Sequence, residues 1–255
     1  MLVSYDGTDF CGWQKQNHGP LKGVGHVLEE ALEKIFRQPI ALYGSGRTDA
    51  GVHAMGQICH FEVERDEKNF NMDLAWALKA QLPSTIVVRK VWQVPDDFHS
   101  TLSATHKTYK YLIYNGNRRN PFVCRFATWV RNPLDLDYLN ACTQFVLGEH
   151  DFKSFQSAGT PVPHTVRTIL KAHWEWRNPK VLQFTVTGTG FLKQMVRNIV
   201  GTQLFLERKG LPAQEMARIL EAHDRTQAGP PAPPEGLFLW KVYYPRELDK
   251  KCREL

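Results

Sequence analysis

The best candidate for a catalytic group is a carboxylate in a glycine-rich stretch near the start of the chain. Residues 44–53 read Gly-Ser-Gly-Arg-Thr-Asp-Ala-Gly-Val-His, which places Arg47 and Asp49 among three glycines. Glycines let the backbone approach a ligand closely, so such a loop can present one acid to a substrate. An aspartate in a glycine turn more often only accepts hydrogen bonds from nearby backbone groups. The stretch by itself leaves both interpretations open.

Other common kinds of catalytic site lack their sequence patterns in this chain. Gly44-x-Gly46 has no third glycine for a dinucleotide fingerprint, and no Gly-Lys-Ser/Thr ending forms a phosphate loop. The ten histidines include no His-Glu-x-x-His pair, and the five cysteines include no Cys-x-x-Cys pair. We therefore expect chemistry by a carboxylate, with no metal and no organic cofactor.

The charge balance favours a polyanionic partner. Lys and Arg number 32 against 26 Asp and Glu, a net charge of +6. Many of the basic residues alternate with aromatic ones, a pattern suited to phosphate contacts and base stacking; these are Lys107, Lys110, Arg118, Arg119, Arg125, Arg131, Arg167, Lys171, Lys193, Arg197, Arg208 and Lys209.

The elements that must position these residues alternate between strands and helices. Period-two and helical spacing of apolar residues distinguishes the two kinds. The predicted strands are 2–5, 40–43, 57–64, 86–94, 108–114, 168–176, 181–187 and 237–244. The predicted helices are 24–36, 73–81, 135–147, 191–206 and 212–223, and the charged tail 247–255 is expected to fray.

Two of these elements carry candidate binding residues. In strand 108–114, Tyr109 shares a face with Tyr111 and Ile113, where an aromatic is most often a core residue. In helix 191–206, Lys193 and Arg197 lie four residues apart beside an apolar stripe, so we expect that a polyanion can approach this face. Solvated charges beside a buried stripe are an equally good interpretation.

The order of elements indicates an α+β fold of two associated lobes. We expect residues 1–104 to form the N-terminal lobe with the Asp49 loop and residues 105–255 to form the C-terminal lobe. The chain shows no signal peptide pattern and no apolar run of membrane-spanning length, so we expect a cytoplasmic protein that does not contact a membrane.

At this point the chain resembles a known family, the TruA-type tRNA pseudouridine synthases. Residues 46–53, Gly-Arg-Thr-Asp-Ala-Gly-Val-His, are similar to the defining stretch of that family. Further similar segments follow in family order: 5–14 (Tyr-Asp-Gly-Thr-Asp-Phe-Cys-Gly-Trp-Gln), 56–57 with 60–61, 103–105 with 109–111, 149–152, 190–191 with 195–201, and 228–238.

The resemblance implies two related lobes whose antiparallel or mixed sheets join at a central catalytic cleft, with helices on the outer faces. It implies a homodimer that isomerises uridine at positions 38 to 40 of the tRNA anticodon stem-loop, without cofactor. Asp49 would be the catalytic nucleophile or base, Tyr109 the active-site aromatic, and Arg197 the partner of Asp49. Contacts to RNA would come from Arg47, Lys107, Lys110 and Lys193.

Two alternatives and two departures from the family pattern remain. An RNA chaperone on the same fold would be expected to have an eroded Asp49 loop, and a nucleosidase would need a second carboxylate across the scissile bond. Thr101 stands where the family usually has an arginine, so one phosphate contact is in doubt. The first helix begins Gly23-Val-Gly-His26 in place of a Thr-Val-Gln-like start, which puts its capping in doubt.

Overall fold

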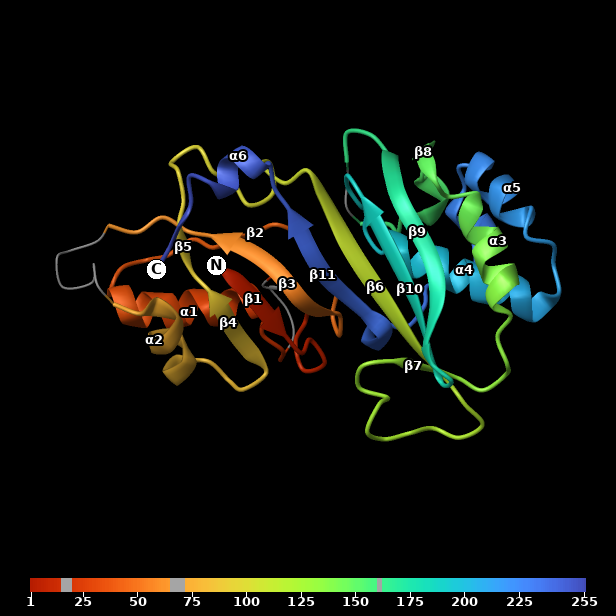
Figure 1. The fold of residues 1–255 in the computed structure, drawn as a ribbon, viewed down its shortest axis with the longest axis horizontal. Helices are drawn as coiled ribbons and strands as arrows, with labels where there is room; N and C mark the ends of the chain where they lie inside the picture. The colour runs from red at the N-terminus through yellow and green to blue at the C-terminus, as the bar shows by residue number, and fades with distance from the viewer. Residues whose placement is uncertain (15–19, 65–71, 160–161) are drawn as a thin grey trace. The chain divides into compact units, whose positions relative to one another are not determined.

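The chain divides into two compact units. The structure is a computed structural model that describes residues 1–14, 20–64, 72–159 and 162–255. Unit 1 comprises Met1–Thr105 together with Leu239–Leu255, and unit 2 comprises His106–Phe238 (Figure 1). The first boundary lies beside the expected one, but the last 17 residues, Leu239–Leu255, belong to unit 1 and not to the second lobe.

Unit 1 is built on sheet strands, of which β1 (Leu2–Tyr5) pairs antiparallel with β3 (His53–His60) and β4 (Ile86–Lys90). The strands lie in the order β4, β1, β3 and β11 (Leu237–Tyr243), and the short β2 (Tyr43–Gly44) pairs with β3. The expected strand 40–43 is wrong except at Tyr43, and β3 covers 53–60 where 57–64 was expected. The sheet therefore begins closer to the Asp49 loop than the apolar pattern indicated.

Two helices accompany this sheet, α1 (Val24–Phe36) and α2 (Leu74–Gln81), both close to their predicted ranges. The N-cap residue of α1, Gly23, gives no side-chain cap. Instead the first helical N–H groups donate to main-chain carbonyls, Val24 to Gly12 O and Gly25 to Trp13 O, each at 2.9 Å. A folded segment thus satisfies the orphan donors that a capping side chain would usually satisfy.

The C-terminal tail is ordered, which corrects the expectation that it frays. Residues Arg246–Asp249 form α6, and β12 (Arg253–Glu254) pairs antiparallel with β5 (Trp92–Gln93). Lys90 Nζ and Glu254 Oε2 lie 2.9 Å apart beside this pairing. The tail is held by partners far away in the sequence, which its own composition cannot indicate.

Unit 2 is built on long strands in the order β6 (His106–Asn115), β10 (Val181–Gly188), β9 (Val166–Asn178) and β8 (Gly148–Asp151), with β7 (Thr128–Val130) parallel to β6. The register pairs Tyr111 with Phe184 and Phe184 with Trp174. These three aromatic side chains are each at most 3% exposed. As predicted, Tyr109, Tyr111 and Ile113 share the buried face of β6.

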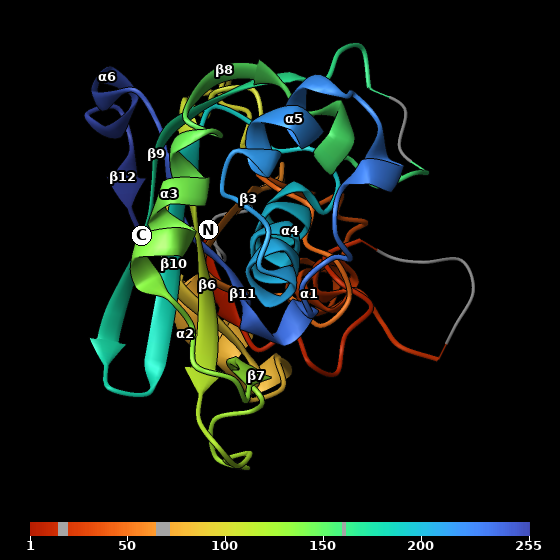
Figure 2. The same ribbon diagram turned by 90° about the vertical axis from the view of Figure 1, so that its right-hand side faces the viewer.

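Helices cover that face of the unit 2 sheet. Figure 2 shows α4 (Met195–Lys209) along one side of the strands, and Trp174 Nε1 donates to Gln203 Oε1 of this helix at 2.8 Å. The remaining elements are α3 (Leu136–Gln144), α5 (Glu215–Glu221) and the short 3-10 turns η1 (Lys153–Phe155), η2 (Arg225–Gln227) and η3 (Pro234–Gly236).

Together the strands and helices of the two units confirm the predicted α+β class. The predicted start of α4 at 191 is wrong by four residues, because Gln194 at the N-cap has a left-handed backbone with φ of 59°. None of the helices in the described ranges has the length and apolar character needed to cross a membrane.

Candidate active site

The loop that carries Asp49 is held by main-chain contacts to the segment after β1. Asp49 forms an isolated antiparallel bridge with Gly12, and Trp13 N donates to Thr48 O at 3.1 Å. Gly12 has φ of 101°, and a Cβ there would lie 2.3 Å from Thr48 O. Only glycine fits this approach. Asp49, which is half-buried, therefore lies in a turn that main-chain contacts hold in place.

A buried glutamine supports the other side of the same loop. Gln57 of β3 is 0% exposed, and its Nε2 donates to Gly46 O at 2.7 Å. Gln57 Oε1 accepts from Ser45 Oγ at 2.8 Å and from Gly46 N at 3.3 Å. One side chain thus satisfies both main-chain groups of Gly46. Its role was missed by the sequence reasoning, because nothing in the pattern of β3 separates a loop-supporting glutamine from a surface one.

Arg47 and Thr101 lie at the surface of unit 1. Arg47 is exposed, two residues before Asp49, as expected for a group that contacts a large substrate. Thr101 Oγ1 donates to Gly44 O at 2.9 Å. The residue that departs from the family pattern therefore helps to hold the start of the Asp49 loop.

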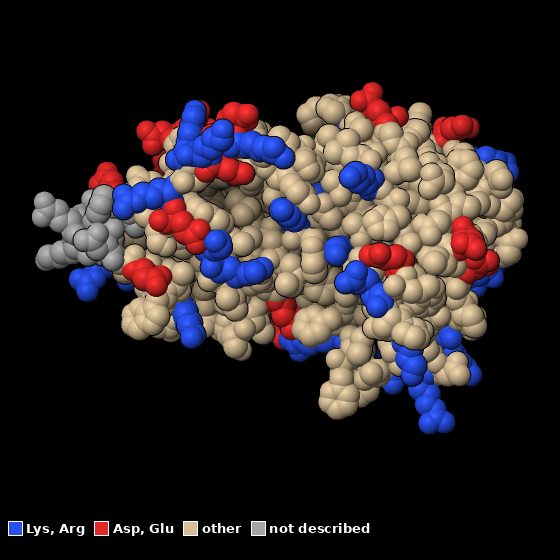
Figure 3. Space-filling model, in the orientation of Figure 1, with Lys and Arg blue, Asp and Glu red and all other residues tan. Residues whose placement is uncertain are grey.

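In unit 2, Tyr109 lies against Phe191. The Tyr109 ring is 8% exposed, and its centroid lies 4.9 Å from that of Phe191 in an edge-to-face arrangement. Lys107 lies two residues earlier on the same face of β6, whereas Lys110 points to the opposite face, because neighbouring strand positions alternate. The side of unit 2 turned to the viewer in Figure 3 carries scattered Lys and Arg side chains.

Two cationic side chains near Tyr109 and Phe191 have lowered pKa values. Burial lowers the pKa of Lys107 and likewise the pKa of Arg167 below their ordinary values. A Cβ added to Gly190 would lie 3.1 Å from Cδ of Arg167, so the Arg167 side chain lies beside the residue that precedes Phe191. Lys193 is exposed, and its Nζ donates to Ala158 O at 2.8 Å. Arg167 was grouped only with the general basic residues. The start of β9 brings it here, where Thr189 N donates to Thr168 O at 3.0 Å, one residue along the chain from each of Gly190 and Arg167.

Arg197 is held by the proline-rich segment that follows η2. It is 9% exposed, and its Nε donates to Ala232 O at 2.7 Å while Ala232 N donates to Arg197 O at 2.9 Å. A Cβ at Gly201 would lie 1.9 Å from Pro230 O, so glycine is required for this packing. The segment 230–232 covers this edge of α4.

This arrangement corrects the expected polyanion face on a single helix. Lys193 precedes α4, which begins at Met195, and Arg197 is buried beneath the segment at Ala232. The two side chains therefore do not form one exposed face of a helix. Arg197 is a buried, oriented guanidinium, and Lys193 is a separate surface cation.

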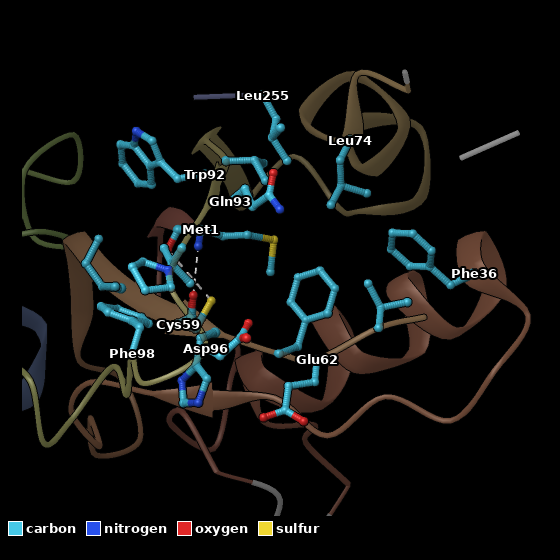
Figure 4. A pocket seen from close by; sticks show the side chains of 17 residues that line it. Met1, Phe36, Cys59, Glu62, Leu74, Trp92, Gln93, Asp96, Phe98 and Leu255 are labelled. Atoms are coloured by element: carbon cyan, nitrogen blue, oxygen red, sulfur yellow. Dashed lines mark hydrogen bonds between the residues drawn. The ribbon is translucent and has the colours of Figure 1, made fainter. Parts of the chain in front are cut away.

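A cavity of about 470 Å³ lies elsewhere in unit 1 (Figure 4). Its lining includes Met1, Phe36, Cys59, Leu74 and Trp92, and Asp49 and Arg47 are not part of it. Burial raises the pKa of the Cys59 thiol to about 11, so it is a thiol and not a nucleophilic thiolate at neutral pH. Within the described ranges, no three His, Cys, Asp or Glu side chains gather as ligands for a metal ion.

Comparison with known proteins agrees with the resemblance seen in the sequence. The model of the tRNA pseudouridine synthase family matches residues 1–101 and 141–245. A tRNA pseudouridine synthase A of Bdellovibrio bacteriovorus is 60% identical over 99% of this chain and 97% of its own length. Proteins of the same name from Streptococcus gordonii and Hydrogenovibrio crunogenus are 41% and 39% identical, over 95% and 97% of this chain and 97% and 92% of their own lengths. This chain therefore belongs to the tRNA pseudouridine synthase family.

Proposed function

We propose that this protein isomerises uridine to pseudouridine at positions 38 to 40 of the tRNA anticodon stem-loop, with Asp49 as the nucleophile or base. Membership of the family supports the reaction class. The observation that carries the role of Asp49 is its half-buried place in a turn fixed by Gly12 on one side and by Gln57 on the other. A preorganised carboxylate reacts without first having to be ordered.

The bond changes of this reaction can be promoted by a carboxylate. The N1–C1′ bond breaks, the uracil turns within the site, C5 bonds to C1′, the C5 proton leaves to water, and N1 takes up a proton. Asp49 can attack C1′, attack C6, or remove a proton to give a glycal-type intermediate. Each route places the same carboxylate next to the same sugar, and none needs an electron acceptor or an activated cofactor.

The target uridine is stacked in the RNA and must be flipped out, at a cost of a few kcal/mol. We assign this step to Arg47, whose exposed guanidinium adjoins the Asp49 loop. Tyr109, backed edge-on by Phe191, stacks on the flipped uracil and takes part in the late proton transfer. From the family resemblance we propose Arg197, which Ala232 orients, as the partner of the Asp49 carboxylate.

Phosphate contacts are the proposed role of the cations around Tyr109. Lys107 shares its strand face, Arg167 lies beside Gly190, and Lys193 is anchored on Ala158. Lys110 lies on the other face of β6 and would contact RNA away from the flipped base. The family resemblance also leads us to propose a homodimer, which sedimentation of the pure protein would measure.

Tritium release tests the proposal. Pure protein is incubated with unmodified tRNA tritiated at uridine C5, with Asp49→Asn and Asp49→Ala as matched variants. We expect release into water by the wild type alone, while both variants retain tRNA binding. Turnover by Asp49→Asn would rule out the assigned role. Release of free uracil would instead identify a nucleosidase, and tight binding without any release would favour an RNA chaperone.

A further inference from the structure

The connection between β6 and β7, residues 116–127, is a basic and aromatic projection. Four arginines and no Asp or Glu occur between Gly116 and Leu134, namely Arg118, Arg119, Arg125 and Arg131. All four are exposed. The loop projects from the end of the strands in Figure 1, and Figure 3 shows Lys and Arg side chains extending from the same edge.

The most exposed large apolar side chain described in the molecule lies in this loop. Phe122 is 92% exposed. Its backbone is nevertheless ordered by a turn centred on Asn120: Asn120 Oδ1 accepts from Phe122 N at 3.0 Å, and Asn120 O accepts from Val123 N and Cys124 N at 3.1 and 3.0 Å. The ring is therefore presented to solvent by a preformed turn.

The base of the loop is anchored to the body of unit 2. Trp129 Nε1 donates to Gly116 O at 2.7 Å, and the Arg119 guanidinium lies 5.2 Å from the centroid of the Trp129 ring. The Asn115 side chain donates to Val130 O at 2.8 Å and to Asn132 O at 2.6 Å. A rigid loop loses little conformational entropy when it binds.

The chemistry of the loop fits RNA. Arginines supply charge for phosphates, and an exposed aromatic face stacks on an unpaired or splayed base. A protein partner would need a wider apolar patch than the Phe122 ring together with the partly exposed Phe126. The loop follows Asn115 and Tyr109 lies six strand residues earlier, about 20 Å away at 3.3 Å per residue. A nucleotide at the loop cannot be the one that stacks on Tyr109.

We propose that residues 116–127 form a second contact site for the tRNA. Phe122 stacks there on a base other than the target uridine, and Arg118 and Arg119 contact neighbouring phosphates. This inference rests on the proposed function for the identity of the RNA. It assigns the loop to substrate affinity and not to the chemical step.

Substitutions of Phe122 test the stacking contact. Phe122→Ala is expected to raise both Kd and KM for unmodified tRNA by about 5- to 100-fold with kcat unchanged. Phe122→Tyr should restore affinity, whereas Phe122→Leu should not, because leucine has no π face. Trp76→Ala is the matched control, since Trp76 of α2 is 72% exposed and lies in unit 1. A Phe122→Ala protein with unchanged Kd, or with lower kcat at unchanged KM, would overturn the proposal.

The salt dependence of binding tests the phosphate contacts. Loss of two contacts in Arg118→Ala/Arg119→Ala should reduce the slope of log Kd against log salt by about 1.4 to 1.8. Arg218→Ala is the control, because Arg218 is exposed but already paired with Glu215 at 2.8 Å. An equal slope for wild type and the double variant would contradict the assignment.

Chemical protection gives a readout that needs no turnover. Cys124 is the exposed cysteine of the chain, while Cys59 and Cys142 are buried. Saturating tRNA should slow alkylation of Cys124 by at least about 5-fold, corresponding to RNA that covers the loop. An unchanged alkylation rate of Cys124 at saturating tRNA would contradict the proposed contact between the loop and the tRNA. Binding and protection can both succeed even if the tritium assay fails, so the loop and the catalytic assignment are judged separately.

Discussion

The Asp49 loop of unit 1 and the segment of α4 around Arg197 in unit 2 each hold one proposed functional side chain in place. They bury that side chain to different extents. Each is held by a distant segment that packs where a glycine leaves room: Gly12 beside Thr48 in one case, Gly201 beside Pro230 in the other. Asp49 remains half-buried on a turn fixed by main-chain contacts. Arg197 is 9% exposed and is oriented by a side-chain bond to Ala232.

The difference follows from the two groups' proposed tasks. A nucleophile must reach the substrate, so its support comes from the backbone behind it and leaves the carboxylate accessible. A guanidinium that orients a carboxylate acts best where water is excluded, and there its remaining N–H donors are directed by packing. Changes at the two sites should therefore have different effects on turnover, binding and stability.

The largest effect is expected from Asp49→Asn. The substitution keeps the shape of the side chain but removes the charge, so turnover should fall by at least about 10³-fold. The turn contacts of Gly12 and Gln57 stay available, so the thermal midpoint should hardly move. Tritium release and thermal unfolding measure the two quantities. A large drop in stability would show that Asp49 supports the loop and is not merely carried by it.

A smaller loss is expected from Arg197→Lys. Lysine keeps the charge, but it has no Nε–H group that could donate to Ala232 O. It also has no planar guanidinium whose other N–H groups could be directed at a second partner. Turnover should fall by about 10²-fold, with tRNA Kd little changed. Single-turnover rates at saturating enzyme and a separate filter-binding Kd check this. A Kd effect equal to the rate effect would place Arg197 in RNA binding instead.

Alanine at the two glycines should sharpen the contrast further. Gly201→Ala and Gly12→Ala each place a Cβ against a main-chain oxygen, at 1.9 and 2.3 Å, so each should lower the free energy of unfolding by about 1–3 kcal/mol. Gly210→Ala is the matched control, because Gly210 has φ of 64° but nothing within 4 Å of its Cβ position. Denaturant unfolding measures all three. Gly12 and Gly210 both have positive φ, so an equal loss in Gly12→Ala and Gly210→Ala would mean that backbone strain, and not close packing, sets the cost at Gly12.

The smallest effect concerns pH. Burial lowers the pKa of Lys107, so its charge is present at low pH and is lost at a lower pH than for an ordinary lysine. The advantage of wild type over Lys107→Met in tRNA affinity should therefore be several-fold near neutral pH and shrink as the pH rises. Comparing the two proteins at each pH cancels titration of the RNA. A constant ratio up to pH 10 would contradict the shift.

Local pattern predicted most of the elements that hold these sites. Helix α1 agrees with its apolar spacing over 24–36, and Asp73 and Asp135 cap α2 and α3 through their side chains as short polar N-caps do. Errors arose where a distant partner decides the outcome. Residues 40–42 have strand composition but no ladder, and the tail that was expected to fray pairs with β5.

The sequence by itself determined the family, the α+β class and the identity of the candidate catalytic acid, because these depend on residue types at short, fixed spacing. Only the tertiary structure decided which groups support that acid. Gln57 and Thr101 reach the Asp49 loop from other parts of unit 1, and Arg197 is buried by a segment more than 30 residues away. Such contacts depend on how glycines let separate segments approach, and no local spacing records that approach.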